Sequence, residues 1–153
     1  MYPGFSTDKA FLRRFQKWIH VKLPTKEQIE VILGKKLEKH DNSLLKYQIR
    51  NLSSQMNGYS PFDIDKILDQ IFEEKYEELL KATTFTKDHN GFYNMCKATH
   101  HQAIQISFET VRDHQYNFPT ICFKDIQKAL HKVKPTNKLA DDNQFVEFVK
   151  DNF

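Results

Sequence analysis

The sequence has 153 residues, of which 39% are hydrophobic, 28% are charged and only 4 are glycine. This length allows one core of ordinary size, and the scarcity of glycine disfavours a turn-rich β-sandwich. The net charge of +3 comes from 23 basic and 20 acidic residues, a balance unlike that of a nucleic-acid-binding surface. We therefore expect a mainly helical protein without a nucleic-acid partner.

Two further features concern the cellular compartment. No stretch approaches the roughly 18 apolar residues of a membrane span, and residues 1–4 lack the basic and apolar regions of a signal peptide. Cys96 and Cys122 have no second pair that would complete a disulfide framework or a four-thiolate zinc site. We expect reduced thiols, a cytoplasmic location and no direct insertion into membranes.

The first helix signal is a capping box. In Thr25-Lys26-Glu27-Gln28 the threonine hydroxyl can accept from the third helical amide while Gln28 reaches back to the cap. Apolar residues follow at helical spacing, first in this helix and then in a second one: Ile29, Ile32, Leu33 and Leu37, then Leu45, Ile49, Leu52 and Met56.

A longer helix is predicted after Asn57-Gly58, because glycine suits the position after a helix C-cap. Ser60 can cap the new helix, Pro61 suits its first position, and Asp63 lies in its first turn. The helix then carries one apolar stripe and an acidic surface that we expect to be solvated: Ile64, Ile67, Leu68, Ile71, Phe72 and Leu79, then Asp69, Glu73, Glu74, Glu77 and Glu78.

Periodicity changes after Gly91. Residues 103–109 alternate with a period of two, which predicts a strand paired with residues 92–96 as a hairpin. A further helix ends at Pro135, and a last one follows: Phe123, Ile126, Leu130 and Val133, then Phe145, Phe148 and Val149. The expected fold class is mainly α: an antiparallel helical bundle with a small two-stranded antiparallel β insertion and a C-terminal helix.

Enzyme motifs are scarce. The sequence has no phosphate loop, no Gly-x-Ser-x-Gly elbow and no His-Glu-x-x-His. The best metal candidates gather around the expected hairpin: Cys96, His100, His101, His114 and Cys122. Their spacing fits no common zinc pattern, and neighbouring histidines on a strand would point to opposite faces, so we expect surface histidines and no metal site.

Two segments carry a resemblance to AAA ATPases. Asp8-Lys9-Ala10-Phe11-Leu12-Arg13-Arg14-Phe15, continuing without gaps to Pro24, resembles their second region of homology. Gly58-Tyr59-Ser60-Pro61-Phe62-Asp63-Ile64 resembles their Gly-Tyr-Ser-Gly-Ala-Asp-Ile at the start of a lid helix. The resemblance implies a helical lid that follows the catalytic domain.

The rest of the chain resembles the vacuolar protein sorting-associated protein 4 family of these ATPases. The matching segments are Ala82-Thr83-Thr84-Phe85, Cys96 with residues 103–111, Lys134-Pro135-Thr136, Phe148 and Asp151. The implied organisation is a remnant of the large ATPase domain (1–24), a helical lid (25–91), a β-hairpin insertion (92–119), and a last lid helix with a C-terminal helix (120–153).

The resemblance also implies site residues. Arg13 and Arg14 match arginines that act on the nucleotide of a neighbouring subunit, although a solvated surface pair is the alternative. Gly58, Tyr59, Ser60 and Phe62 match the lid motif that approaches the adenine. Leu12, Trp18 and the pair Pro61-Phe62 depart from the family pattern. Phe62 has three open roles: stacking on the base, covering the pocket differently, or packing into the core.

The implied function belongs to the whole protein. With ATP and magnesium, a ring of six or more subunits would disassemble ESCRT filaments in endosomal sorting and membrane scission. It would be recruited peripherally to endosomal membranes, and an activator protein would dock on the hairpin. This chain lacks the phosphate loop, so we expect it to be inactive and to bind no cofactor. Two alternatives stay open: the lid of a microtubule-severing ATPase of the same clade, and a free-standing helical adaptor.

Overall fold

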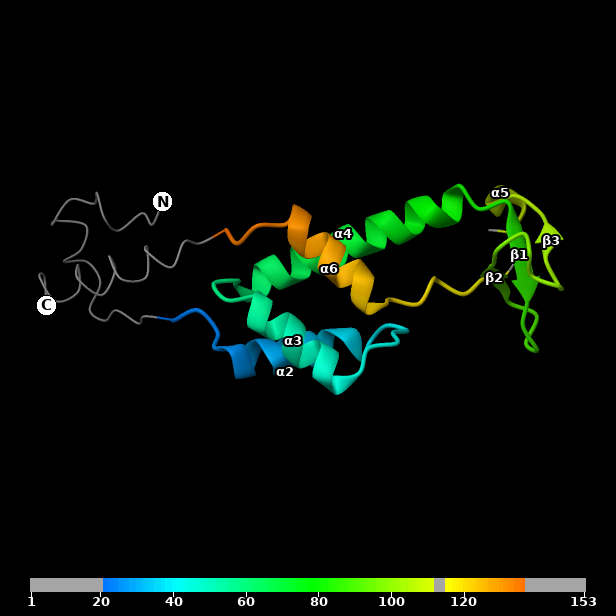
Figure 1. Ribbon diagram of the computed structural model, residues 1–153. Coiled ribbons are helices and arrows are strands. Elements are labelled where there is room, and N and C mark those ends of the chain that lie inside the picture. The colour runs from blue at the N-terminus through cyan, green and yellow to red at the C-terminus, as the bar shows by residue number, and fades with distance from the viewer. Residues whose placement is uncertain (1–20, 112–114, 137–153) are drawn as a thin grey trace, which may run out of the picture.

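The structure, a computed structural model, describes residues 21–111 and 115–136. In this part of the chain a helical bundle and a small sheet lie at opposite ends of one long helix, α4 (Figure 1). No helix among the described residues is long and apolar enough to cross a membrane. The expected helix around Phe145, Phe148 and Val149 lies outside the described residues, as does the expected ATPase-domain remnant up to residue 20.

The capping box at Thr25 is confirmed. Helix α2 spans Lys26–Leu37, and the Thr25 amide donates to Gln28 Oε1 at 2.9 Å while Thr25 Oγ1 accepts from the Gln28 amide. Helix α3 spans Lys46–Gln55 and packs against α2. The predicted apolar residues of both helices face the bundle core except Leu45, the N-cap of α3, which is 56% exposed.

Helix α4 spans Pro61–Leu80 and also begins as predicted. Ser60 is its N-cap, Pro61 its first residue, and Asp63 completes a capping box. Gly58 has φ 86, the left-handed conformation that glycine adopts at low cost, so the chain can reverse between α3 and α4.

Helix α6, Phe123–Lys132, closes the bundle against α4 and ends before Pro135. The core consists of buried side chains from all four helices and the segments between them: Ile29, Leu33, Leu37, Leu52, Met56, Tyr59, Ile64, Ile67, Leu68, Ile71, Ile121, Ile126 and Ala129. The mainly helical fold class is confirmed.

The sheet differs from the expected hairpin. It has three strands in the order β2-β1-β3: β1 is Thr84–Lys87, β2 is Tyr93–Met95 and β3 is Ile104–Gln105. The two segments expected to pair with each other instead flank β1 on opposite sides, both antiparallel to it. The sheet therefore starts before the expected insertion at residue 92.

The predicted strand over residues 103–109 is also too long. Phe108–Val111 form a short helix, α5, in which the Thr110 and Val111 amides both donate to the Ser107 carbonyl. Phe108 consequently does not share a strand face with Ile104 and Ile106. It packs in a second core with Leu79, Phe85, Tyr93 and Val111.

Residues 115–121, here called the connecting segment, join the sheet to the bundle through the backbone. At one end the Tyr93 amide donates to Gln115 O and the Asn117 amide to Tyr93 O, both at 2.9 Å. At the other end the Ser43 amide donates to Ile121 O and the Ile121 amide to Asp41 O, both at 3.0 Å. The sheet is thus attached at two places, through α4 and through this segment.

Ion pairs join the outer sides of α4 and α6. Glu74 accepts from Lys128 at 2.6 Å and from Lys132 at 2.7 Å, and Lys75 pairs with Asp125 at 3.1 Å. Hydrogen bonds from the two lysines lower the pKa of Glu74 to about 2. This part of the acidic surface is therefore a contact between helices and not only a solvated face.

We expect Glu74→Gln to lower the free energy of unfolding by about 1 kcal/mol at pH 7, because the variant keeps the size of the side chain but loses its charge. The folded-state pKa of Glu74 is lowered from 4.5, so its stabilisation is complete above pH 4.5 and is lost as the pH falls towards about 2. Denaturant titrations at pH 7 and pH 3 should show a smaller acid loss in Glu74→Gln than in wild type. The matched control is Glu73→Gln, a change at an exposed neighbour; equal acid losses in both variants would contradict the assignment.

Candidate functional site

The turn between α3 and α4 and the first residues of α4 contain the four lid-motif residues predicted to approach a nucleotide. Gly58 and Tyr59 are buried, Ser60 is half-buried and Phe62 is exposed. The Tyr59 hydroxyl donates to the Val133 carbonyl at 2.8 Å, and burial, together with nearby Asp63, raises its pKa. Tyr59 and Ser60 therefore shape the turn, and Phe62 is the one of the four whose ring is free to meet a ligand.

Phe62 has 61% of its surface exposed. The Lys66 ammonium lies 4.6 Å from the centre of its ring, one helical turn along α4. Core packing, one of the three roles left open by the sequence, is therefore excluded. Stacking on a base and covering a pocket both remain compatible with this position.

Asp63 is fully buried at the base of the same turn. Its Oδ2 accepts from the Ser60 amide at 2.9 Å and from the Ser60 hydroxyl at 2.8 Å, and its Oδ1 accepts from the Thr136 amide and hydroxyl. Burial acts to raise the pKa of Asp63, but the hydrogen bonds from Thr136 and Ser60 together outweigh burial and lower it. The sequence predicts the role of Asp63 at the helix start, but not its contact with Thr136.

An apolar groove lies beside the turn, between the start of α2 and the first residue of α4. Its lining residues are Val21, Lys22, Pro24, Glu27, Gln28, Val31, Ile32 and Pro61, and we call it the Pro61 groove. Val21 and Val31 are exposed there although their side chains are apolar. A surface of this kind can receive a flat apolar group or the apolar side chains of another domain.

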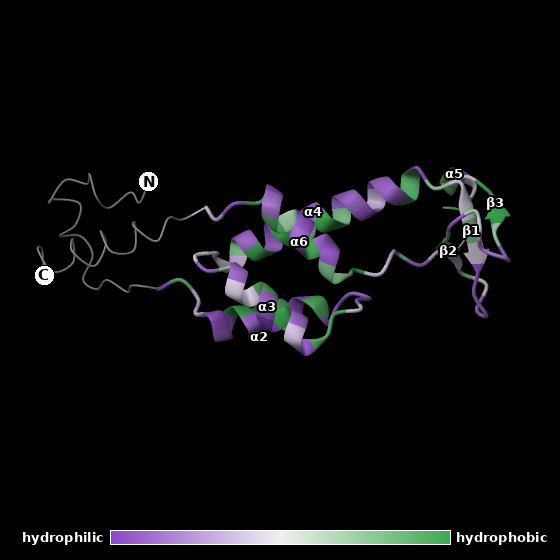
Figure 2. Cartoon of the chain, viewed as in Figure 1, coloured by the Kyte–Doolittle hydropathy of each residue, from purple (hydrophilic) through white to green (hydrophobic). Residues whose placement is uncertain are grey.

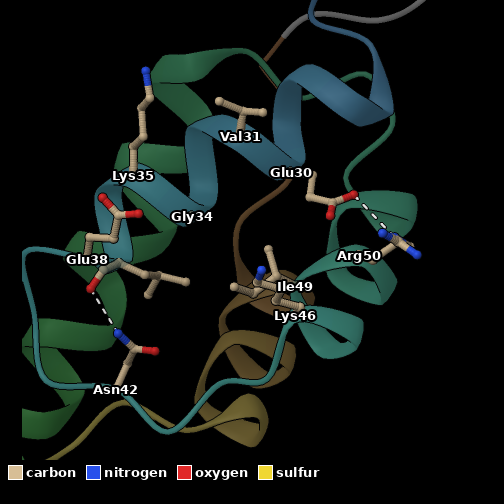
Figure 3. A pocket seen from close by; sticks show the side chains of 10 residues that line it. Glu30, Val31, Gly34, Lys35, Glu38, Asn42, Lys46, Ile49 and Arg50 are labelled. Carbon is tan, nitrogen blue, oxygen red and sulfur yellow. Dashed lines mark hydrogen bonds and ion pairs between the residues drawn. The ribbon is translucent and has the colours of Figure 1, made fainter.

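A second groove lies between α2 and α3 and was not predicted from the sequence (Figure 3). Glu30 and Arg50 approach to 3.5 Å across it, and Asn42 Nδ2 donates to the Leu37 carbonyl at 2.9 Å. Gly34 leaves its wall open, since a Cβ there would meet no atom within 4 Å. A glycine inside a predicted helix is the sequence feature that could have indicated this opening. The lining carries both charge signs and so selects no ligand class.

Several predicted site residues do not come together in the described structure. Arg13, Arg14 and His114 lie outside it. His100 and His101 are exposed in a turn, as expected of surface histidines, and their ring centres stack at 4.6 Å. Within residues 21–111 and 115–136, no three His, Cys, Asp or Glu side chains are grouped to hold a metal ion.

Comparison with known proteins shows which proteins this chain is similar to. Residues 93–152 match the family described as the Vps4 C terminal oligomerisation domain. The chain is 26% identical over 155 aligned residues to vacuolar protein sorting-associated protein 4B of Pongo abelii, which includes 94% of this chain and 35% of that protein. The chain is therefore similar to vacuolar protein sorting-associated protein 4 over most of its length, and to its oligomerisation domain in the C-terminal part. It spans about a third of the length of its Vps4 relatives.

Two other similarities are to spastin and to a solved structure of Vps4. Spastin of Danio rerio is 39% identical over 77 residues, which is 47% of this chain and 14% of spastin. A crystal structure of Vps4 and Vta1 superposes with a TM-score of 0.53 at 20% identity, covering 72% of this chain and 99% of that one. At this identity the structural similarity supports the fold alone.

We expect Phe62→Ala to change the free energy of unfolding by less than about 0.5 kcal/mol, because most of its ring already contacts solvent. The matched control is Phe85→Ala, which removes a fully buried ring from the second core and should cost about 3 to 5 kcal/mol. Thermal and denaturant unfolding measure both changes. A cost above about 2 kcal/mol for Phe62→Ala would mean that its ring is structural.

Proposed function

We propose that this chain is the lid and C-terminal part of an ATPase that assembles into a ring and disassembles ESCRT filaments in endosomal sorting and membrane scission. The observation that carries the proposal is the exposed apolar surface made by Phe62 and the Pro61 groove. It lies at the start of α4, where the lid motif of the resembling family approaches the nucleotide. The match to a Vps4 oligomerisation domain supports the ring.

The proposed cofactors of the whole protein are ATP and magnesium. Apolar Pro61, Val31 and the Phe62 ring suit the flat face of a base, which they would hold against the catalytic domain. The triphosphate and its metal need a phosphate loop with magnesium-binding carboxylates placed beside it, and this sequence contains no phosphate loop. We therefore propose that the chain supplies a wall of the base pocket and does not turn over ATP by itself.

Arg13 and Arg14 are the proposed catalytic residues. Phosphoryl transfer spreads negative charge over the γ-phosphoryl oxygens, and a guanidinium supplied by the adjacent subunit stabilises that charge. The neighbouring subunits of a hexamer or larger ring are therefore proposed partners, since each site would be completed only by the next copy.

In the whole protein, Arg13→Ala should leave nucleotide affinity within about threefold while lowering turnover by a thousandfold or more. Mixed rings provide the decisive measurement. An Arg13→Ala subunit with an intact phosphate loop should regain turnover beside a subunit that has Arg13 but a disabled loop. Loss of nucleotide affinity in the mutant's own site would contradict a role across the subunit boundary.

The sheet is the proposed docking site for an activator protein. Residues 115–117 cover the outer side of β2, whereas among the described residues no backbone hydrogen bond reaches the outer side of β3. Both residues of β3 are exposed, including the apolar side chain of Ile104. A short open strand edge with one apolar residue suits reversible docking. The structure of Vps4 and Vta1 suggests Vta1 as the activator.

Ile104→Asp should weaken Vta1 binding at least tenfold, because it places a charge on this edge. The matched control is Met95→Asp, which changes a similarly exposed apolar residue on the other neighbour of β1. Binding by Met95→Asp should stay within about threefold of wild type in calorimetry. Equal losses, or none, would place the docking surface elsewhere.

The alternatives are a microtubule-severing relative and a free-standing adaptor. The Danio rerio spastin match includes 47% of the chain, whereas the Pongo abelii protein 4B match includes 94%. This difference favours the ESCRT-related function. We also propose that the protein is cytoplasmic and is recruited peripherally to endosomal membranes. An upstream phosphate loop in the transcript would separate an ATPase from an adaptor.

A further inference from the structure

The chain that leaves α6 is held against the turn that begins α4. Val133 accepts a hydrogen bond from the Tyr59 hydroxyl, and Thr136 donates from both its amide and its hydroxyl to Asp63 Oδ1. Residues 133–136 are the last described stretch before residues 137–153. Residues 133–136 are therefore held against the start of α4 by Tyr59 and Asp63.

Asp63 is suited to hold residues 133–136 because its buried carboxylate has few hydrogen-bond donors other than those of Thr136. It is fully buried, and among the described residues no lysine, arginine or histidine pairs with it. Its compensation comes from four donors, two on Ser60 and two on Thr136. A buried carboxylate that loses donors is strongly destabilised, so Thr136 cannot move away without a cost in free energy.

We infer that Asp63 is a positioning residue that holds residues 133–136 on the start of α4. The family match to an oligomerisation domain covers residues 93–152, so the side chain that holds its residues 133–136 lies outside the matched range. This inference rests on the proposed function and deepens it. The surface proposed to face a nucleotide and residues 133–136, which belong to the range matched to the oligomerisation domain, share one attachment at Asp63.

The first test measures the attachment in this chain. Thr136→Val removes the hydroxyl donor but keeps the backbone amide and the cap of α4. Amide hydrogen exchange at residues 59–64 and 133–136 should become at least about tenfold faster, as expected for a lost hydrogen bond to a charged group. Thr136→Ser keeps a hydroxyl and should restore slow exchange.

The matched control is Thr120→Val. Thr120 Oγ1 donates to Asp41 Oδ2 at 2.7 Å, so this variant also loses a threonine–aspartate hydrogen bond, but in the connecting segment. It should leave exchange at residues 59–64 and 133–136 unchanged. Unchanged exchange there in Thr136→Val, or an equal increase in Thr120→Val, would overturn the role of Asp63.

The second test measures the consequence in the whole ATPase. Sedimentation with ATP should show that Thr136→Val rings need a several-fold higher protein concentration than wild type, Thr136→Ser or Thr120→Val rings. Faster exchange with wild-type assembly would overturn the inference, because Asp63 would then position nothing that assembly uses. If wild type itself does not assemble with ATP, the proposed function fails, and the exchange result alone decides whether Asp63 holds the segment.

Discussion

Helix α4 contributes side chains to both hydrophobic cores. The 20 residues of α4 extend over about 30 Å, and its first half packs in the bundle while Leu79, near its end, enters the second core. Between the two cores its surface is mostly hydrophilic (Figure 2). Neither core alone accounts for a helix of this length. The capping box at Ser60, the α6 lysines on Glu74 and the packing of Leu79 stabilise its beginning, middle and end.

The same helix determines what the turn before it can do. Phe62 is exposed because the apolar stripe of α4, which starts at Ile64, lies on the opposite side of the helix, and Pro61 is exposed as the first residue of the helix. Asp63 lies between these two environments, buried on the side where the chain returns from α6. The turn therefore has one side that fixes the fold and another that is available to a ligand or a second domain.

Local sequence rules predict the helices well and the sheet poorly. Thr25 and Ser60 act within three residues of themselves, so their hydrogen bonds can be inferred from the residue types alone. The pairing of β1 with both β2 and β3 depends on Phe85, whose burial requires Phe108 and Leu79 from elsewhere in the chain. Alternation over residues 103–109 predicted a strand, but the packing of Phe108 favours a helical turn.

The candidate site likewise has a part that could be predicted from local sequence and a part that could not. The lid motif is contiguous, so its place at the start of a helix could be predicted, and its residues lie there. The contact between Asp63 and Thr136 joins residues 73 positions apart, and the Pro61 groove combines two helices. Neither has a local pattern, because each depends on how the bundle closes.

The connecting segment gives the sheet a mechanical property that a single helical stalk would lack. A body attached only at the end of α4 could twist about the helix axis, whereas backbone hydrogen bonds at Tyr93 and at Ser43 oppose that rotation. A force applied to the sheet is then shared by two arms, one ending in the bundle core and the other at the loop between α2 and α3. Torque on the small sheet is thus delivered to the bundle as a whole.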